Sequence, residues 1–146
     1  MTTGPLDREV GKRLDQHAVR YTRGRRHVVT TLAGADGPLS AAEIHGRMDG
    51  ELPLSSLYRS LSVLEEADVV APHHSKKGLT RYELAEWLRG HHHHLVCIDC
   101  GAVDDVEVAD EHEEDVDRIV NDISRAASFT PVSHALEIEG RCARCA

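Results

Sequence analysis

Metal-ligating side chains are concentrated between residues 91 and 100, where the sequence reads His-His-His-His-Leu-Val-Cys-Ile-Asp-Cys. Cys97 and Cys100 form one C-x-x-C pair in this stretch, and Cys142 and Cys145 form a second pair near the end of the sequence. A C-x-x-C turn offers two thiolates to one ion, and zinc prefers four ligands in a tetrahedron. The sequence therefore predicts a structural zinc site built by all four cysteines.

The spacing of the two cysteine pairs carries a structural consequence. Forty-one residues separate Cys100 from Cys142, which is more than a simple zinc ribbon contains. A small folded unit must therefore lie between the two cysteine turns. The competing interpretation is a pair of redox disulfides or free thiols. We favour zinc, because closely paired cysteine turns in an intracellular chain more often hold metal.

The run of four histidines is internal, so it is not a purification tag, which would stand at a terminus. Successive side chains of a strand point to opposite faces. If the run enters a strand over residues 94–97, His92 and His94 share one face, and His91 and His93 share the other. One tract can then supply two separate metal sites. The alternative is a solvated, histidine-rich loop.

Charge is distributed unevenly along the chain. Residues 1–90 carry 13 Lys/Arg against 12 Asp/Glu, whereas residues 91–146 carry 4 against 13. The first part can approach a polyanion, and the second has carboxylates to spare for cations. The sequence has no apolar run of 18 residues and no signal-peptide pattern. We therefore expect a cytoplasmic protein with no membrane partner, whose thiols stay reduced.

Capping residues and apolar spacing predict four helices in the first part. An amphipathic helix covers residues 6–16, Thr22 caps the next helix, and Ser40 with Glu43 forms a capping box for the third. The fourth helix begins at Ser55 and buries leucines spaced four and three residues apart. A basic hairpin over residues 69–84 follows, so the first part is expected to form a winged helix-turn-helix.

The fourth helix has an exposed face typical of a recognition helix in a DNA major groove, with a plain surface helix as the alternative. That face carries Ser55, Ser56, Tyr58 and Arg59. Basic residues at the second helix and at the hairpin tip are expected to meet phosphates, with ordinary solvated charge as the alternative. These residues are Arg23, Arg25, Arg26, Lys76 and Lys77.

The second part is expected to form a small α+β unit with strands over 94–97, 102–108 and 133–139. A helix over 110–127 carries acidic residues in its first turns, which suits the positive end of the helix dipole. Such a unit is too small to bury a large core, so zinc and a partner subunit are expected to supply the missing stability. The fold class is α+β. We place the winged-helix DNA-binding domain at 1–88 and the metal-binding dimerisation domain at 89–146.

These motifs together resemble the ferric uptake regulator family of bacterial metal-dependent repressors. The resemblance runs from Arg13 to Cys145 and rests on S-x-x-Y-R-x-L, on H-L-V-C-x-x-C-G after the histidines, and on the terminal C-x-x-C. It implies a homodimer that binds AT-rich, pseudo-palindromic operator DNA when loaded with metal. In this family Tyr58-Arg59 and the Thr22/Arg25 pair serve DNA binding, and the four cysteines hold structural zinc.

The resemblance also implies two regulatory metal sites. The sensing site between the domains corresponds to Glu83, His92, His94 and Asp105. The second site, inside the dimerisation domain, corresponds to His91, His93, His134 and an acid best matched by Asp117. The chain carries extra residues before its long helix, so Glu113 or His112 remains open as a replacement for Asp117.

Two departures from the family pattern concern the sensing site. Pro38 stands where iron and peroxide sensors usually place a histidine, and the cysteine that zinc sensors place near the end of the wing is absent. His73 or His74, on the wing, is therefore a candidate for a missing ligand. Imidazoles and carboxylates accept Zn²⁺, Fe²⁺, Mn²⁺ or Co²⁺, so the sensed metal stays open.

The sequence thus predicts a metal-dependent transcriptional repressor of metal-uptake genes. A metallohydrolase would need an open metal position with a general base beside it, and the sequence contains no H-E-x-x-H motif. We therefore expect no enzymatic activity. The alternatives are a metal buffer or metallochaperone, and a peroxide- or thiol-sensing regulator of the same fold.

Overall fold

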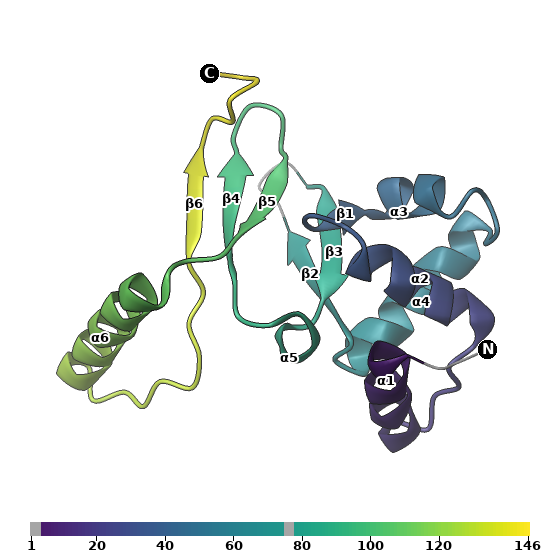
Figure 1. Cartoon of the computed structure of the whole chain (residues 1–146), viewed down its shortest axis with the longest axis horizontal. Coiled ribbons are helices and arrows are strands. Elements are labelled where there is room, and N and C mark those ends of the chain that lie inside the picture. Colours follow the sequence, from purple (N-terminus) through teal and green to yellow (C-terminus); the bar gives the residue numbers. More distant parts are fainter. Residues whose placement is uncertain (1–3, 75–77) are drawn as a thin grey trace. The chain divides into compact units, whose positions relative to one another are not determined.

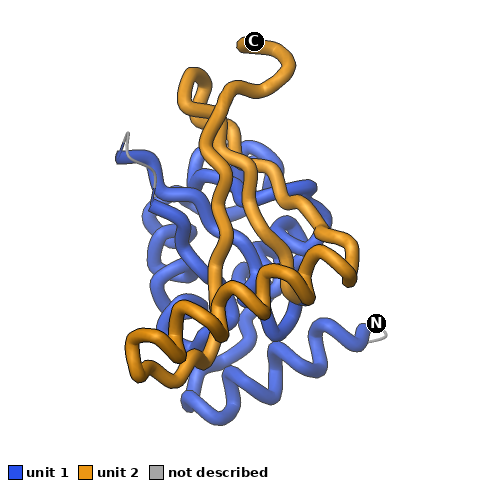
Figure 2. Tube along the Cα trace, turned by 90° about the vertical axis from the view of Figure 1, so that its left-hand side faces the viewer, with its two compact units in different colours: residues 1–90 blue, residues 91–146 orange. Residues whose placement is uncertain are grey.

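The computed structural model describes residues 4–74 and 78–146 and divides into two compact units, residues 1–90 (unit 1) and residues 91–146 (unit 2) (Figure 2). The boundary expected from the sequence, after residue 88, differs from this division by two residues. No helix in the described part of the chain is long and apolar enough to span a bilayer.

Unit 1 contains five helices among its described residues (Figure 1). They are α1 (Pro5–Gln16), α2 (Arg23–Ala33), α3 (Ala41–Arg47), α4 (Leu54–Glu66) and α5 (Glu86–Arg89). The Thr22 hydroxyl accepts a hydrogen bond from the Arg25 backbone N–H at 3.3 Å, as expected of an N-cap. Ser40 caps α3 in the same way through the Glu43 N–H at 3.2 Å.

The sheet of unit 1 is antiparallel with strand order β1-β3-β2. Its strands are β1 (Leu39–Ser40), β2 (Val70–His74) and β3 (Thr80–Leu84). The hairpin of β2 and β3 is the predicted wing, whereas β1 and α5 were not expected. β1 is too short to show alternation, and its two residues pair with Tyr82 and Arg81. Lys76 and Lys77 lie outside the described residues.

The core of unit 1 is aliphatic and joins every long helix to the sheet. Val10 and Leu14 of α1 are fully buried, as are the valines of α2. Leu57, Leu61 and Leu64 present the predicted stripe of α4 to this core. Burial of each such side chain contributes about 1.5–3 kcal/mol.

Unit 2 has a three-stranded sheet of order β5-β4-β6 beside one long helix (Figure 1). Its elements are β4 (His93–Cys97), β5 (Val103–Val106), α6 (Asp110–Ala126) and β6 (Glu137–Gly140). β5 runs antiparallel to β4, whereas β6 runs parallel to it. The α+β class and the winged-helix unit followed by a smaller α+β unit are confirmed. The last strand is shorter than the predicted 133–139, so His134 precedes it.

Unit 2 buries very little. His93, Cys97 and Ser124 are its only buried residues. Ile119 and Ile123 of α6, expected to face inward, are 57% and 65% exposed. Val116 and Val120 of the same predicted stripe are half-buried, so its isoleucines are the part that unit 2 leaves uncovered.

Candidate metal centres and DNA-binding helix

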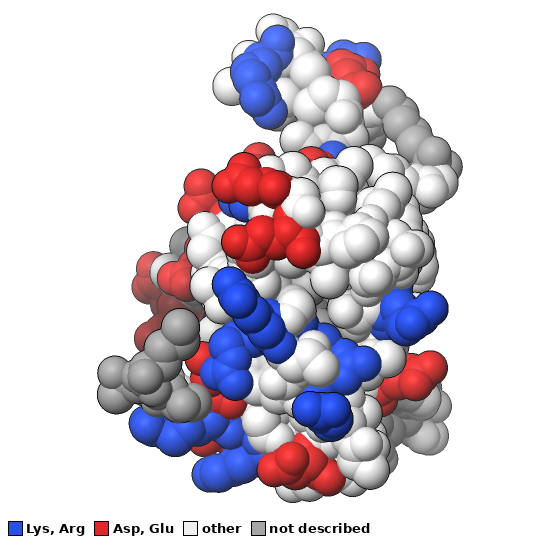
Figure 3. All heavy atoms as spheres, turned by 90° about the vertical axis from the view of Figure 1, so that its right-hand side faces the viewer, with Lys and Arg blue, Asp and Glu red and all other residues white. Residues whose placement is uncertain are grey.

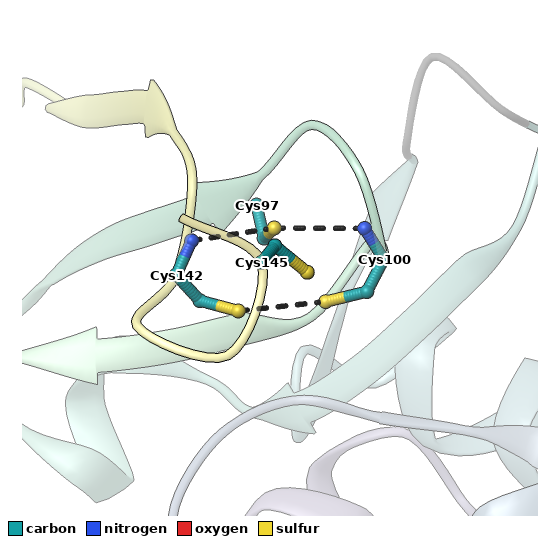
Figure 4. Close-up of side chains that lie close together, drawn as sticks. All are labelled: Cys97, Cys100, Cys142 and Cys145. Carbon is teal, nitrogen blue, oxygen red and sulfur yellow. Dashed lines mark hydrogen bonds between the residues drawn. The ribbon is translucent and has the colours of Figure 1, made fainter.

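The four cysteines converge although they come from the two ends of unit 2 (Figure 4). Cys97 ends β4, Cys100 closes the following turn, and the other pair follows β6. Because β6 pairs with β4 in parallel register, with Cys97 opposite Gly140, the two C-x-x-C turns emerge side by side. The four sulfur atoms lie within 4.8 Å of one another.

The geometry of this cluster fits a tetrahedral ion. Cys100 Sγ lies 3.8 Å from Cys142 Sγ, and the edge of a tetrahedron with Zn–S bonds of about 2.3 Å is about 3.8 Å. The backbone N–H groups of Cys100 and Cys142 donate to Cys97 Sγ at 3.5 and 3.4 Å. These bonds, with that of Cys100 the largest cause, lower the pKa of the Cys97 thiol to about 6. The turn thus favours the thiolate that zinc requires.

A second cluster gathers three imidazoles around one carboxylate in unit 2. Glu113, in the first turn of α6, lies 2.7 Å from His91 Nε2, 2.8 Å from His93 Nε2 and 2.8 Å from His134 Nε2. The hydrogen bond to His93 is the largest of the causes that lower the pKa of Glu113 to about 2, followed by those to His134 and His91. Three nitrogens and a carboxylate form a ligand set for a divalent metal.

The acid that the structure brings into this cluster is Glu113, not the Asp117 that the sequence favoured. The Asp117 carboxylate is 60% exposed and lies 3.7 Å from His134 Nδ1, on the far side of the ring from Glu113. His112, the other alternative, is exposed on α6. In the structure, the carboxylate that lies among the three imidazoles is one helical turn before Asp117.

The remaining two histidines of the tract turn to the other side of β4. His94 pairs with Asp105 across β4 and β5, so both side chains lie on one face of the sheet. His94 Nε2 lies 3.3 Å and His92 Nε2 lies 3.6 Å from Asp105 Oδ1. The tract is therefore divided between two carboxylates in the alternating pattern that the period of a strand predicts.

Glu83, the fourth residue expected at the sensing site, belongs to unit 1. It stands on β3, where its carboxylate Oε1 lies 2.6 Å from His73 Nε2 of β2. His74 instead lies 3.2 Å from the Thr80 hydroxyl. The sequence named both wing histidines as candidates, and the structure places one of them against Glu83.

The exposed face of α4 carries the predicted DNA-binding side chains. Tyr58 is 51% exposed, and Ser55 and Arg59 are also exposed, while Ser56 is half-buried. Leu57 and Leu61 hold the opposite side of the helix in the core. The packing of α4 therefore directs these polar groups outward.

The basic residues of α2 are engaged to different degrees. Arg23 is exposed, whereas Arg25 donates to the Arg20 carbonyl at 2.7 Å. Arg26 forms an ion pair with Asp7 at 2.9 Å and stacks over the Tyr21 ring. The helical face of unit 1 carries Lys and Arg side chains interspersed with carboxylates (Figure 3).

Comparison with known proteins decides the family. A model described as the Ferric uptake regulator family matches residues 16–139.

The chain belongs to the ferric uptake regulator family.

The ferric uptake regulation protein of Bacillus subtilis is 34% identical over 145 residues, which cover 96% of this chain and 93% of that protein. The corresponding protein of Brucella abortus is 30% identical over 128 residues, with 86% of each chain covered. Ferric uptake regulators are metal-dependent transcriptional regulators that bind operator DNA as dimers, and this chain is a regulator of that kind.

Solved structures show the same fold. The Helicobacter pylori ferric uptake regulator superimposes with a TM-score of 0.79 at 22% identity, covering 99% of this chain and 94% of that chain. The Vibrio cholerae regulator gives a TM-score of 0.74 at 25% identity, with 90% and 98% covered. The helices and the two small sheets are therefore the arrangement of this family.

Proposed function

We propose that this ferric uptake regulator represses metal-homeostasis genes as a cytoplasmic homodimer and has no catalytic role. Each chain would hold one structural zinc and sense a divalent metal. The observation that carries the proposal is the division of His91–His94 between two carboxylates, Glu113 and Asp105. A buffer needs only metal capacity, whereas two distinct clusters in a chain that also carries a winged helix would allow separate stabilising and sensing roles.

The sensing site is assigned to Glu83, His92, His94 and Asp105. Three of these residues belong to unit 2, and Glu83 belongs to unit 1. Binding one ion by all four would favour arrangements of the two units that bring Glu83 to the other ligands. Metal then shifts the population toward a DNA-competent dimer by the difference in its affinity for the two states.

The second regulatory site is assigned to His91, His93, Glu113 and His134. All four residues lie in unit 2, so metal there stabilises that unit and does not by itself change its orientation toward unit 1. Glu113 anchors the start of α6 to β4 and to the segment before β6. We therefore expect this site to set stability and to shift the metal response.

Homodimerisation is supported by the uncovered apolar face of unit 2. Ile119 and Ile123 of α6 are mostly exposed, as are Phe129 at 68% and Val132 at 97%. Large apolar side chains gathered on one helix and the segment after it mark an interface. A second copy of this chain would cover this face and pair two recognition helices.

DNA binding is assigned to α4, with Arg23 and the wing lysines Lys76 and Lys77 at phosphates. Tyr58 and Arg59 would read base edges in the major groove. A symmetric dimer reads a palindrome, with half-sites separated by about one DNA turn or a multiple. The AT-rich character of the operator is carried over from the family.

The proposal is tested by DNA affinity against free metal. A duplex selected by the metal-loaded protein from random sequences serves as the operator, and Zn²⁺, Fe²⁺, Mn²⁺ and Co²⁺ are titrated in turn. Glu83→Ala and His92→Ala should each abolish metal-activated binding while one zinc per chain is retained. His93→Ala should keep activation but lower the stability of unit 2 or change the metal concentration required.

Two outcomes would contradict the assignment. If His93→Ala loses activation and His92→Ala retains it, the two clusters have exchanged roles. If the parent protein binds metal and no metal changes its affinity for any selected duplex, the chain is a metal buffer. Arg59→Ala provides the DNA control, because it should weaken operator binding with metal content and dimer unchanged.

A further inference from the structure

A histidine on the wing of unit 1 is placed like a metal ligand. Ala71 lies directly opposite Glu83 in the hairpin of β2 and β3, and His73 lies opposite Arg81. These four residues share one face of the hairpin, since cross-strand partners point the same way. Ala71 is small, so the diagonal neighbour His73 can reach Glu83, and its Nε2 lies 2.6 Å from Oε1.

The cation on the same face is directed elsewhere. Arg81 Nη1 lies 2.6 Å from Glu43 Oε1, so this guanidinium pairs with α3. On this face of the hairpin, the side chain that contacts Glu83 from β2 is therefore the diagonal imidazole of His73. A carboxylate that served only as a structural anchor would be better matched to the guanidinium.

The same geometry recurs at the cluster of unit 2. His91, His93 and His134 each point Nε2 at a Glu113 oxygen at 2.7–2.8 Å. Two ligands of one ion, each about 2.1 Å from it at right angles, stand about 3 Å apart. At 2.6 Å the His73–Glu83 pair is hydrogen-bonded and slightly closer than two such donors, so its two groups need to separate by only a few tenths of an ångström to share an ion.

We propose that His73 is a ligand of the sensed metal, so that unit 1 contributes two donors, His73 and Glu83, from neighbouring strands. This inference rests on the proposed sensing site and extends its ligand set to three imidazoles and two carboxylates. His74 is not part of it, because its side chain belongs to the opposite face of the hairpin, beside Thr80.

Cobalt provides a direct test in the full-length protein with zinc kept in the cysteine site. Glu113→Ala serves as the common background, so that cobalt binding at the second cluster is weakened and the first equivalent reports mainly on the sensing site. His73→Cys should add a sulfur-to-cobalt charge-transfer band, because the new thiolate would bind the metal. The matched variant His74→Cys, one residue along and on the other face, should add none.

A loss-of-ligand variant completes the experiment. His73→Asn should lower Co²⁺ affinity at least about tenfold and change the visible cobalt spectrum, whereas His74→Asn should change neither. Trp87, the only tryptophan, lies in unit 1. Its fluorescence should show unchanged unfolding of metal-free His73→Asn, which separates lost ligation from misfolding.

The failures of the two proposals are distinguishable. If His73→Cys adds no band, or His73→Asn keeps the parent spectrum with or without a loss of affinity, His73 is not a ligand. Glu83→Ala in the same background reports on the sensing site itself. If Glu83→Ala binds cobalt like the parent, the proposed sensing site is wrong.

Discussion

Unit 1 and unit 2 are held together by different chemistry. Unit 1 buries aliphatic side chains from four helices and the wing around one core. In unit 2 only His93, Cys97 and Ser124 are buried, and two of these three are candidate metal ligands. The helical unit can fold on apolar burial alone, whereas the smaller unit depends on metal and on a partner subunit.

The largest expected effect is the loss of unit 2 when its cysteine site is broken. Cys97→Ser should lose one zinc per chain and the dimer, because metal binding and folding are coupled in small units. Unit 1 should keep its Trp87 fluorescence transition. Zinc content, sedimentation and fluorescence provide the three measurements. Ile98→Ser, an exposed neighbour in the same turn, is the matched control and should retain zinc.

A pair of apolar truncations contrasts the two units. Leu61→Ala removes a side chain that is 1% exposed in the core of unit 1 and should cost about 2–5 kcal/mol of unfolding free energy. Ile123→Ala should change the free energy of unfolding of the monomer by about 0.5 kcal/mol or less, because this side chain is mostly exposed. It should instead weaken the dimer. If Ile123→Ala lowers the free energy of unfolding of the monomer as much as Leu61→Ala does, unit 2 has an apolar core like that of unit 1, and the contrast between the two units is wrong.

Within unit 2, the two acids of α6 should behave differently. Glu113→Ala removes the carboxylate that three imidazoles share and should weaken metal binding at that cluster at least about tenfold. Asp117→Ala, one turn later and exposed, should change that affinity little. Isothermal titration with the cysteine site already filled measures both. A larger loss in Asp117→Ala would restore the assignment made from the sequence.

The smallest expected effect is at a helix cap in unit 1. Thr22→Ala removes the hydroxyl that accepts the Arg25 N–H and should cost about 1 kcal/mol. Metal affinity of unit 2 should be unaffected. Chemical denaturation followed by Trp87 fluorescence detects the change. A cost below the error of that measurement would show that the backbone of α2 is held by its buried valines alone.

Sequence patterns located those elements whose signals are local. Caps at Thr22 and Ser40, the leucine spacing of α4 and the alternation through the histidine tract depend on neighbouring residues, and each appears in the structure. The division of the tract follows from the period of a strand. The convergence of the four cysteines could be predicted because zinc prefers four ligands, even though the pairing of the strands between the two C-x-x-C turns was not predicted.

Features that depend on pairing between distant parts of the chain could not be predicted from the sequence. The parallel pairing of β6 with β4 has no local sequence signature, and β1 exists only because β3 lies beside it. The choice between Glu113 and Asp117 depends on how the start of α6 approaches β4, which residue counting cannot give. The position of His73 against Glu83 likewise depends on hairpin register, with Ala71 as its only hint.

Hydrogen–deuterium exchange with and without a zinc chelator tests the central claim most directly. Chelation should remove the protection of backbone amides in β4, β5 and β6 while the amides of α2 and α4 keep theirs. Restoring Zn²⁺ should restore the protection of unit 2. If the backbone amides of the unit 2 sheet stay protected from exchange without metal, or if both units lose protection together, the fold of unit 2 does not depend specifically on its metal.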